Sequence, residues 1–261
     1  MQKKQLVLAL LAGVAMPGAA QATLIDRGGG MIYDDVLNIT WLQDANYAKT
    51  SRYDKGVAGD EWDKPGMMTW SEATAWAADL SYGGYTDWRL PTMIDTGAAG
   101  CDWKFSGTDC GYNVQMFDAS SGTVYSEMAY MYYVNLGLKP LYKPVGTYNR
   151  NSDFGLWGNG TLDSNGGTDS YGQNDVGLIK NLQAYWYWSG LEADPNSVSG
   201  FTGIAWIFHQ GVAFQGPAGD IPSYAWAVRD GDVAAVPEAD TWAMLLAGLG
   251  LVGVAARRRR G

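Results

Sequence analysis

The segment from Gly66 to Thr92 most constrains the possible folds of this chain, because it encodes a helix, a turn and a strand in succession. Thr69 is a suitable helix N-cap, and Glu72 completes a capping box that satisfies backbone amides at a helix start. Apolar residues then recur at helical spacing as far as Leu80. Gly83-Gly84 ends the helix and turns the chain.

A short strand should follow this turn, over residues 87–92, and its Arg89 needs partners if it is buried. Ser126 should cap a second helix, from Glu127 to Leu136. Aromatic segments of the last third predict an antiparallel meander, at residues 185–189, 204–208 and 224–228. We therefore expect an α+β fold with two main helices packed on a twisted antiparallel sheet and long Gly/Asn-rich loops.

The composition suits one large domain, which we place at residues 23–235. The chain has 261 residues, of which 47% are hydrophobic, and it contains 12 Trp, 16 Tyr and 35 Gly. This content can bury one substantial core and is typical of a loop-rich, β-leaning protein. Most of the aromatic residues should pack in that core, and an exposed subset that stacks on sugars is the alternative.

The N-terminus has the pattern of a secretory signal peptide, at residues 1–22. Lys3-Lys4 precede an apolar run, residues 6–14, and Ala20-Gln21-Ala22 forms a cleavage site. An uncleaved membrane anchor is the alternative, but the apolar run is too short to span a bilayer. The mature chain should begin at Thr23, outside the cytoplasm.

The C-terminus, residues 236–261, has the pattern of a second targeting signal. Pro237-Glu238 is followed by an apolar run, residues 242–256, and by four arginines that begin with Arg257-Arg258. As a helix, this run reaches only about 22 Å, short of the roughly 30 Å hydrocarbon thickness. The arginines would stay on the cytoplasmic side. An ordinary single-span tail anchor is the alternative.

This order of residues resembles the PEP-CTERM sorting tail, although Ala239 stands where that tail usually has proline. The resemblance implies that an exosortase-type membrane protease of a Gram-negative bacterium recognises and removes the tail. It also implies delivery to the outer surface or extracellular matrix, with a transient inner-membrane anchor. The tail would be the only part in contact with a membrane.

The body between the two targeting segments is strongly acidic. Six of the 18 basic residues and two of the 27 acidic residues lie in the terminal segments, so the body has a formal net charge of −13. Such a charge disfavours nucleic acid and anionic membranes as partners. It also disfavours sulfated polysaccharides.

Cys101 and Cys110 are the only two cysteines, and in an exported chain they should form a local disulfide. A redox pair or a metal site is the alternative. A zinc site would need two more soft ligands, and the chain offers only His209.

The segment 149–174 reads as a long surface loop rich in Gly, Asn, Asp and Ser. Asp163, Asn165 and Asp169 could ligate Ca²⁺ through their oxygens. The EF-hand pattern fails, because Gly167 stands at a ligand position and no closing glutamate follows. We therefore favour solvated turns over a cation site, and no other cofactor is indicated.

No catalytic motif is apparent in the sequence. His209, the single histidine, follows Phe208 in a strand pattern, and no nucleophile is marked nearby. A half-exposed strand histidine is a simpler interpretation than a general base. We expect that the protein is not an enzyme.

Several blocks of the body resemble a bacterial extracytoplasmic domain related to the C-terminal domain of the Lcl collagen-like adhesin. The resemblance extends more distantly to C-type-lectin-like and formylglycine-generating-enzyme folds. It implies a lectin-like architecture and, by the adhesin relative, glycan binding. That relative's sulfated-glycan preference suits a basic surface, so the ligand does not carry over to this acidic body. The blocks are residues 34–47, 70–92, 109–114, 126–129, 187–190 and 225–229.

Two functional hypotheses follow. The first is a module that binds glycan or exopolysaccharide, or mediates adhesion, through aromatic residues in loops. Its candidates are Trp103, Trp157 and Tyr171. The second is a structural matrix or biofilm protein with no discrete ligand site. Exposed aromatics on a concave surface would favour the first, and fully buried tryptophans would favour the second.

Overall fold

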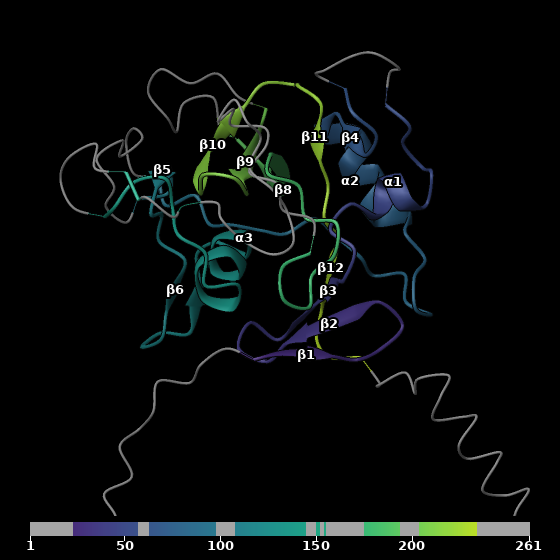
Figure 1. Cartoon of the computed structure of the whole chain (residues 1–261), viewed down its shortest axis with the longest axis horizontal. Coiled ribbons are helices and arrows are strands. Elements are labelled where there is room, and N and C mark those ends of the chain that lie inside the picture. Colours follow the sequence, from purple (N-terminus) through teal and green to yellow (C-terminus); the bar gives the residue numbers. More distant parts are fainter. Residues whose placement is uncertain are drawn as a thin grey trace, which may run out of the picture.

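Short strands, rather than helices, make up most of the fold. A computed structural model describes residues 23–56, 63–97, 108–144, 150–151, 154, 175–193 and 204–233. In these parts twelve strands form three sheets. The two larger sheets lie at opposite ends of the body (Figure 1).

The four-stranded sheet combines the beginning of the body with its end. Its order is β1 (Leu24–Asp26), β2 (Met31–Asp34), β3 (Ile39–Leu42) and β12 (Val228–Asp230). All its pairs are antiparallel. The last strand therefore completes a sheet that the first residues begin.

The six-stranded sheet contains two of the three strands of the predicted meander, β8 (Trp186–Glu192) and β9 (Ala205–His209). Its order is β4 (Met67–Met68), β11 (Ser223–Tyr224), β8, β9, β10 (Phe214–Ala218) and β5 (Gly111–Tyr112). Strands β8, β9 and β10 pair antiparallel, but β11 pairs parallel to β8. The expected strand at 224–228 is thus divided, since β11 and β12 belong to different sheets. A separate hairpin joins β6 (Phe117–Asp118) to β7 (Thr123–Val124).

The helices of the described residues are short. They are α1 (Tyr47–Thr50), α2 (Trp70–Asp79), α3 (Glu127–Tyr130) and the π-helix η1 (Met131–Asn135). The capping box of α2 is confirmed: the Thr69 hydroxyl accepts from the Glu72 amide, and the Glu72 carboxylate accepts from the Thr69 amide.

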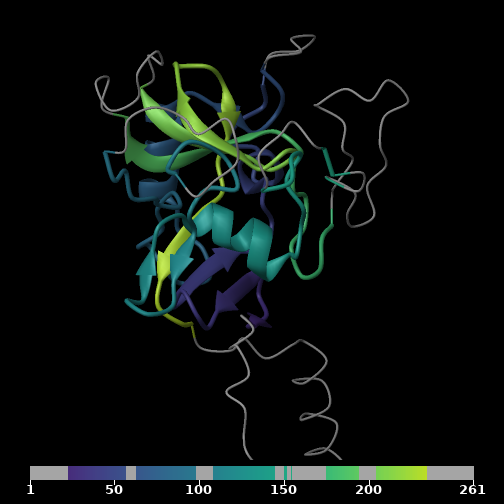
Figure 2. The same cartoon turned by 90° about the vertical axis from the view of Figure 1, so that its left-hand side faces the viewer.

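The expected α+β, lectin-like arrangement of two main helices on a sheet is wrong, because the fold is mostly β. The second helix is not one regular α-helix. Residues 127–132 are all buried, and Figure 2 shows α3 and η1 enclosed between the two larger sheets. A helix buried on all sides has no polar stripe and forms no separate layer.

Tryptophan side chains fill the core and connect distant segments. The rings of Trp41 and Trp226 lie 4.5 Å apart between centroids. The Trp226 indole N–H donates to the Leu42 carbonyl at 2.7 Å, and the Trp188 indole donates to the Met68 carbonyl at 2.7 Å. The indole N–H groups of Trp188 and Trp226 are therefore hydrogen-bonded in the interior, and each bond joins two elements of the fold.

Candidate functional site

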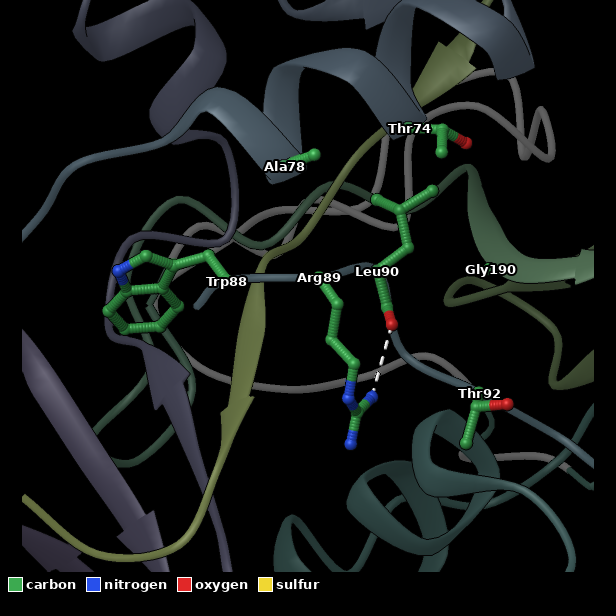
Figure 3. Close-up of a pocket in the computed structure, with 7 residues that line it drawn as sticks. All are labelled: Thr74, Ala78, Trp88, Arg89, Leu90, Thr92 and Gly190. Atoms are coloured by element: carbon green, nitrogen blue, oxygen red, sulfur yellow. Dashed lines mark hydrogen bonds between the residues drawn. The ribbon is translucent and has the colours of Figure 1, made fainter. Parts of the chain in front are cut away.

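A cavity of about 220 Å³ lies between α2 and the extended segment 88–92 (Figure 3). In Figure 3 the Leu90 side chain points toward α2, whereas the Arg89 side chain turns away toward α3. Leu90 and Trp88 are buried. The lining residues are Thr74, Ala78, Trp88, Arg89, Leu90, Thr92 and Gly190.

The sequence positions these walls locally. Because α2 turns its Ala73 and Ala77 inward, Thr74 and Ala78 lie on its exposed face. The opposite wall is held by backbone bonds, since the Gly190 amide donates to the Pro91 carbonyl at 2.8 Å. That glycine lies where the β8–β9 register shifts. A capped helix and a strand irregularity thus define the cavity.

Arg89 is fully occupied by protein partners. Its two terminal nitrogens donate to both oxygens of Glu127, each at 2.8 Å. The remaining guanidinium hydrogens go to the Leu90 carbonyl and, twice, to Asp230. An arginine has five N–H donors, and all five are used here.

Arg89 therefore connects the segment 88–92 to α3 and β12. None of its guanidinium N–H groups is left to bind an anion. Burial alone would lower its pKa, but the hydrogen bonds and charges of Glu127 and Asp230 raise the pKa overall. The guanidinium remains charged throughout the physiological pH range.

The cavity is small, and its lining suits a small neutral group. Its volume is below the roughly 300–1,000 Å³ of typical small-molecule sites. Its polar side chains, apart from the engaged Arg89, are Thr74 and Thr92, both exposed. It lacks a carboxylate, histidine or cysteine in its lining.

His209 is buried, not half-exposed as the strand pattern predicts. Only 4% of its surface is accessible, and its Nδ1 accepts a hydrogen bond from the Gly211 amide at 2.9 Å. The Trp186 ring lies 4.5 Å away between centroids. Burial lowers the pKa of His209 to about 3, so the imidazole is neutral near pH 7.

Most of the sequence-predicted site residues lie outside the described residues. Cys110 is buried, but its expected partner Cys101 lies outside, so the disulfide stays a prediction. No group of three or more His, Cys, Asp or Glu side chains suited to a metal ion occurs within the described ranges. The outlying residues also include Trp103, Trp157, Tyr171, Asp163, Asn165, Asp169, Ala22, Pro237, Glu238, Arg257 and Arg258.

An ion pair that the sequence does not predict joins the two ends of the body. Arg27, which follows β1, donates from Nε to Asp232 at 2.8 Å, and a second bond from its Nη2 makes the pair bidentate. The two residues are separated by 205 positions. No local pattern in the sequence marks such a pair.

The C-terminal segment matches a known family. Residues 235–260 match the PEP-CTERM protein-sorting motif. The chain is thus an exported protein whose tail is a substrate of exosortase. No helix in the described part of the chain has the length and apolarity needed to cross a membrane.

No curated protein is similar to this chain. No solved structure matches it either. The resemblance to the Lcl C-terminal domain is therefore not confirmed.

Proposed function

We propose that this exported, exosortase-sorted protein is a structural component of the bacterial surface or extracellular matrix. Its body contributes a stable, acidic, densely packed unit and carries out no catalysis. Sorting through the tail places that unit outside the cytoplasm, where extracellular material is assembled.

The burial of the tryptophans carries this proposal. Among the described residues, six tryptophans are at most 3% accessible, and the other two, Trp70 and Trp186, are half-buried. Sugar-binding surfaces use aromatic faces that solvent can reach. The described tryptophans instead serve packing, as the indole bonds of Trp188 and Trp226 illustrate.

The state of the charged groups also supports a non-catalytic role. A general base or acid needs a pKa near the working pH. His209 is neutral and enclosed, and Arg89 has no donor left for a substrate. The charge pair of Arg89 with buried Glu127 joins elements of the fold.

Glycan binding or adhesion is the second candidate, favoured by the cavity beside α2. Its apolar floor and its hydroxyls on Thr74 and Thr92 suit part of a neutral sugar. The loop residues Trp103, Trp157 and Tyr171 would add stacking faces, and Ca²⁺ on Asp163, Asn165 and Asp169 could order their loop.

The two candidates are separated by binding measurements on the purified, exported protein. We would screen neutral, acidic and sulfated glycans and the organism's own exopolysaccharide, each with and without Ca²⁺. The structural role predicts no saturable binding, and it predicts a mechanically weaker matrix in a deletion strain. Saturable binding to any glycan would contradict it.

A matched pair of variants then locates any binding. Ala78→Phe places a ring in the cavity, whereas Ala75→Phe places the same ring on the exposed face of α2 outside the lining. Loss of binding in Ala78→Phe alone would assign the ligand to the cavity. Loss only in the Trp103, Trp157 and Tyr171 alanine variants would assign it to the loops.

A further inference from the structure

The folded body ends almost directly at the sorting motif. Val233 is buried at 5% accessibility, and the motif begins at residue 235. Asp232 is fixed by Arg27, and its own carbonyl accepts from Arg229 at 3.2 Å. The described part of the body therefore ends two positions before the sorting motif begins.

Both ends of the body lie at the four-stranded sheet. The Thr23 amide donates to Asp35 in the β2–β3 turn, and the Gly231 amide donates to the Asn38 carbonyl of the same turn. The connection between β10 and β11 lies at the opposite end of the molecule (Figure 1). We call the surface formed by Asp26, Arg27, Asp35, Asp230 and Asp232 the tail-proximal face.

Chain length limits how far this face can move from the membrane. The apolar run begins at Trp242, nine residues after Val233, and an extended chain of that length spans at most about 30 Å. A compact body of this size has a radius of gyration of about 17 Å and is roughly 40 Å across. While the tail is inserted, the tail-proximal face therefore stays within about 30 Å of the membrane, and the opposite end cannot touch the membrane surface.

The Pro-Glu dipeptide of the sorting motif is also close to the folded body. Pro237-Glu238 lies four residues after Val233, within about 14 Å of a buried position. A protease that reaches this dipeptide must have its own surface against the body. Of the four aspartates on the tail-proximal face, Asp232 pairs with Arg27 and Asp230 pairs with Arg89. The exposed Asp26 and Asp35 supply the remaining negative charge. They would be repelled by anionic lipid headgroups and attracted to basic protein loops.

We propose that the tail-proximal face docks on the extracytoplasmic surface of the membrane-embedded sorting protease while the tail is processed. The partner is a protein surface with basic residues, rather than lipid. The Arg27–Asp232 pair holds the base of the tail beside this face. The inference concerns sorting and is independent of the structural role proposed above.

Photo-crosslinking in cells that contain the sorting protease tests this proposal. A benzophenone amino acid replaces Asp35 or, separately, Asp26 in the full chain, and exposed Ile221 between β10 and β11 is the control. We expect at least tenfold more adduct with the protease from position 35 or 26 than from position 221. Equal adducts, adducts with lipid, or normal processing without an adduct at either position would overturn the proposal.

A spacer provides an independent measurement. Ten Gly-Ser residues inserted after Val233 should reduce the adduct at positions 35 and 26 at least fivefold while the tail is still removed. The same insert in the β6–β7 turn should leave the adduct unchanged. Persistence of the adduct in the first insertion would show that the contact does not depend on the short connection, and would contradict the proposal.

Discussion

Arg89 and Glu127 form two parallel hydrogen bonds of 2.8 Å, although they lie 38 residues apart. Glu127 also accepts from the Thr92 amide at 2.8 Å. One carboxylate thus fixes both the segment 88–92 and the start of α3. This geometry gives the first prediction.

Glu127→Gln should lower the free energy of unfolding by about 2–4 kcal/mol, because it leaves a partly buried guanidinium without its main counter-charge. Asp230→Asn removes the other carboxylate from the same arginine. That carboxylate is exposed, so its loss should cost less than about 1 kcal/mol. Urea unfolding measures both variants, and equal losses would contradict the assignment of Glu127 as the main partner.

Thr69→Ala should destabilise the protein by about 1 kcal/mol, because the α2 N-cap is lost. The Thr69 hydroxyl, followed by the Thr69 amide, lowers the pKa of Glu72, so the variant should raise that pKa. In the wild type this contribution is present above the unfolded pKa and is lost as the pH falls through the folded pKa. An NMR titration of Glu72 measures the change, and Ser71→Ala should leave it nearly unaltered.

Acid should destabilise the protein through His209. Because its folded pKa is about 3 and its ordinary pKa is 6.5, the unfolded chain takes up a proton that the folded chain does not. Stability should therefore fall by about 1.4 kcal/mol per pH unit below pH 6.5, until about pH 3.

His209→Asn keeps an oxygen acceptor near the Gly211 amide and should remove this part of the pH dependence. His209 is the single histidine, so its imidazole NMR signals are assigned directly. Titration of those signals near pH 6.5 in the folded protein would contradict the prediction.

Cys101→Ser should lower stability by about 2–3 kcal/mol under oxidising conditions, since the predicted disulfide constrains the unfolded chain. A reductant should abolish the difference between the variant and the wild type. Mass spectrometry of the unreduced protein provides the direct measurement. Alkylation of both cysteines in denatured, unreduced protein would rule out the disulfide.

Sequence patterns predicted the elements that depend on interactions between residues close together in the chain. The capping box at Thr69 and Glu72 fixes the start of α2 within four residues. The antiparallel pairing of β8 with β9 agrees with the first two aromatic strands of the predicted meander, whereas β10 was not predicted. The C-terminal order of Pro237-Glu238, apolar run and arginines agrees with the matched sorting motif.

The sequence did not predict the partners of these elements. The second helix was expected to cover a sheet, but residues 127–132 are all buried, and periodicity cannot show which layers surround them. Similarly, the aromatic pattern at 224–228 does not reveal that β11 and β12 enter different sheets. Both outcomes depend on contacts with distant segments.

The sequence by itself determined that the chain is exported and sorted, because the sorting motif is a contiguous segment that another protein recognises. It also determined where α2 begins, through bonds between near neighbours. Only the tertiary structure decided that Arg89 is saturated, that the described tryptophans are enclosed, and that Arg27 meets Asp232. These relationships join residues far apart in the chain, and packing of the whole core selects them.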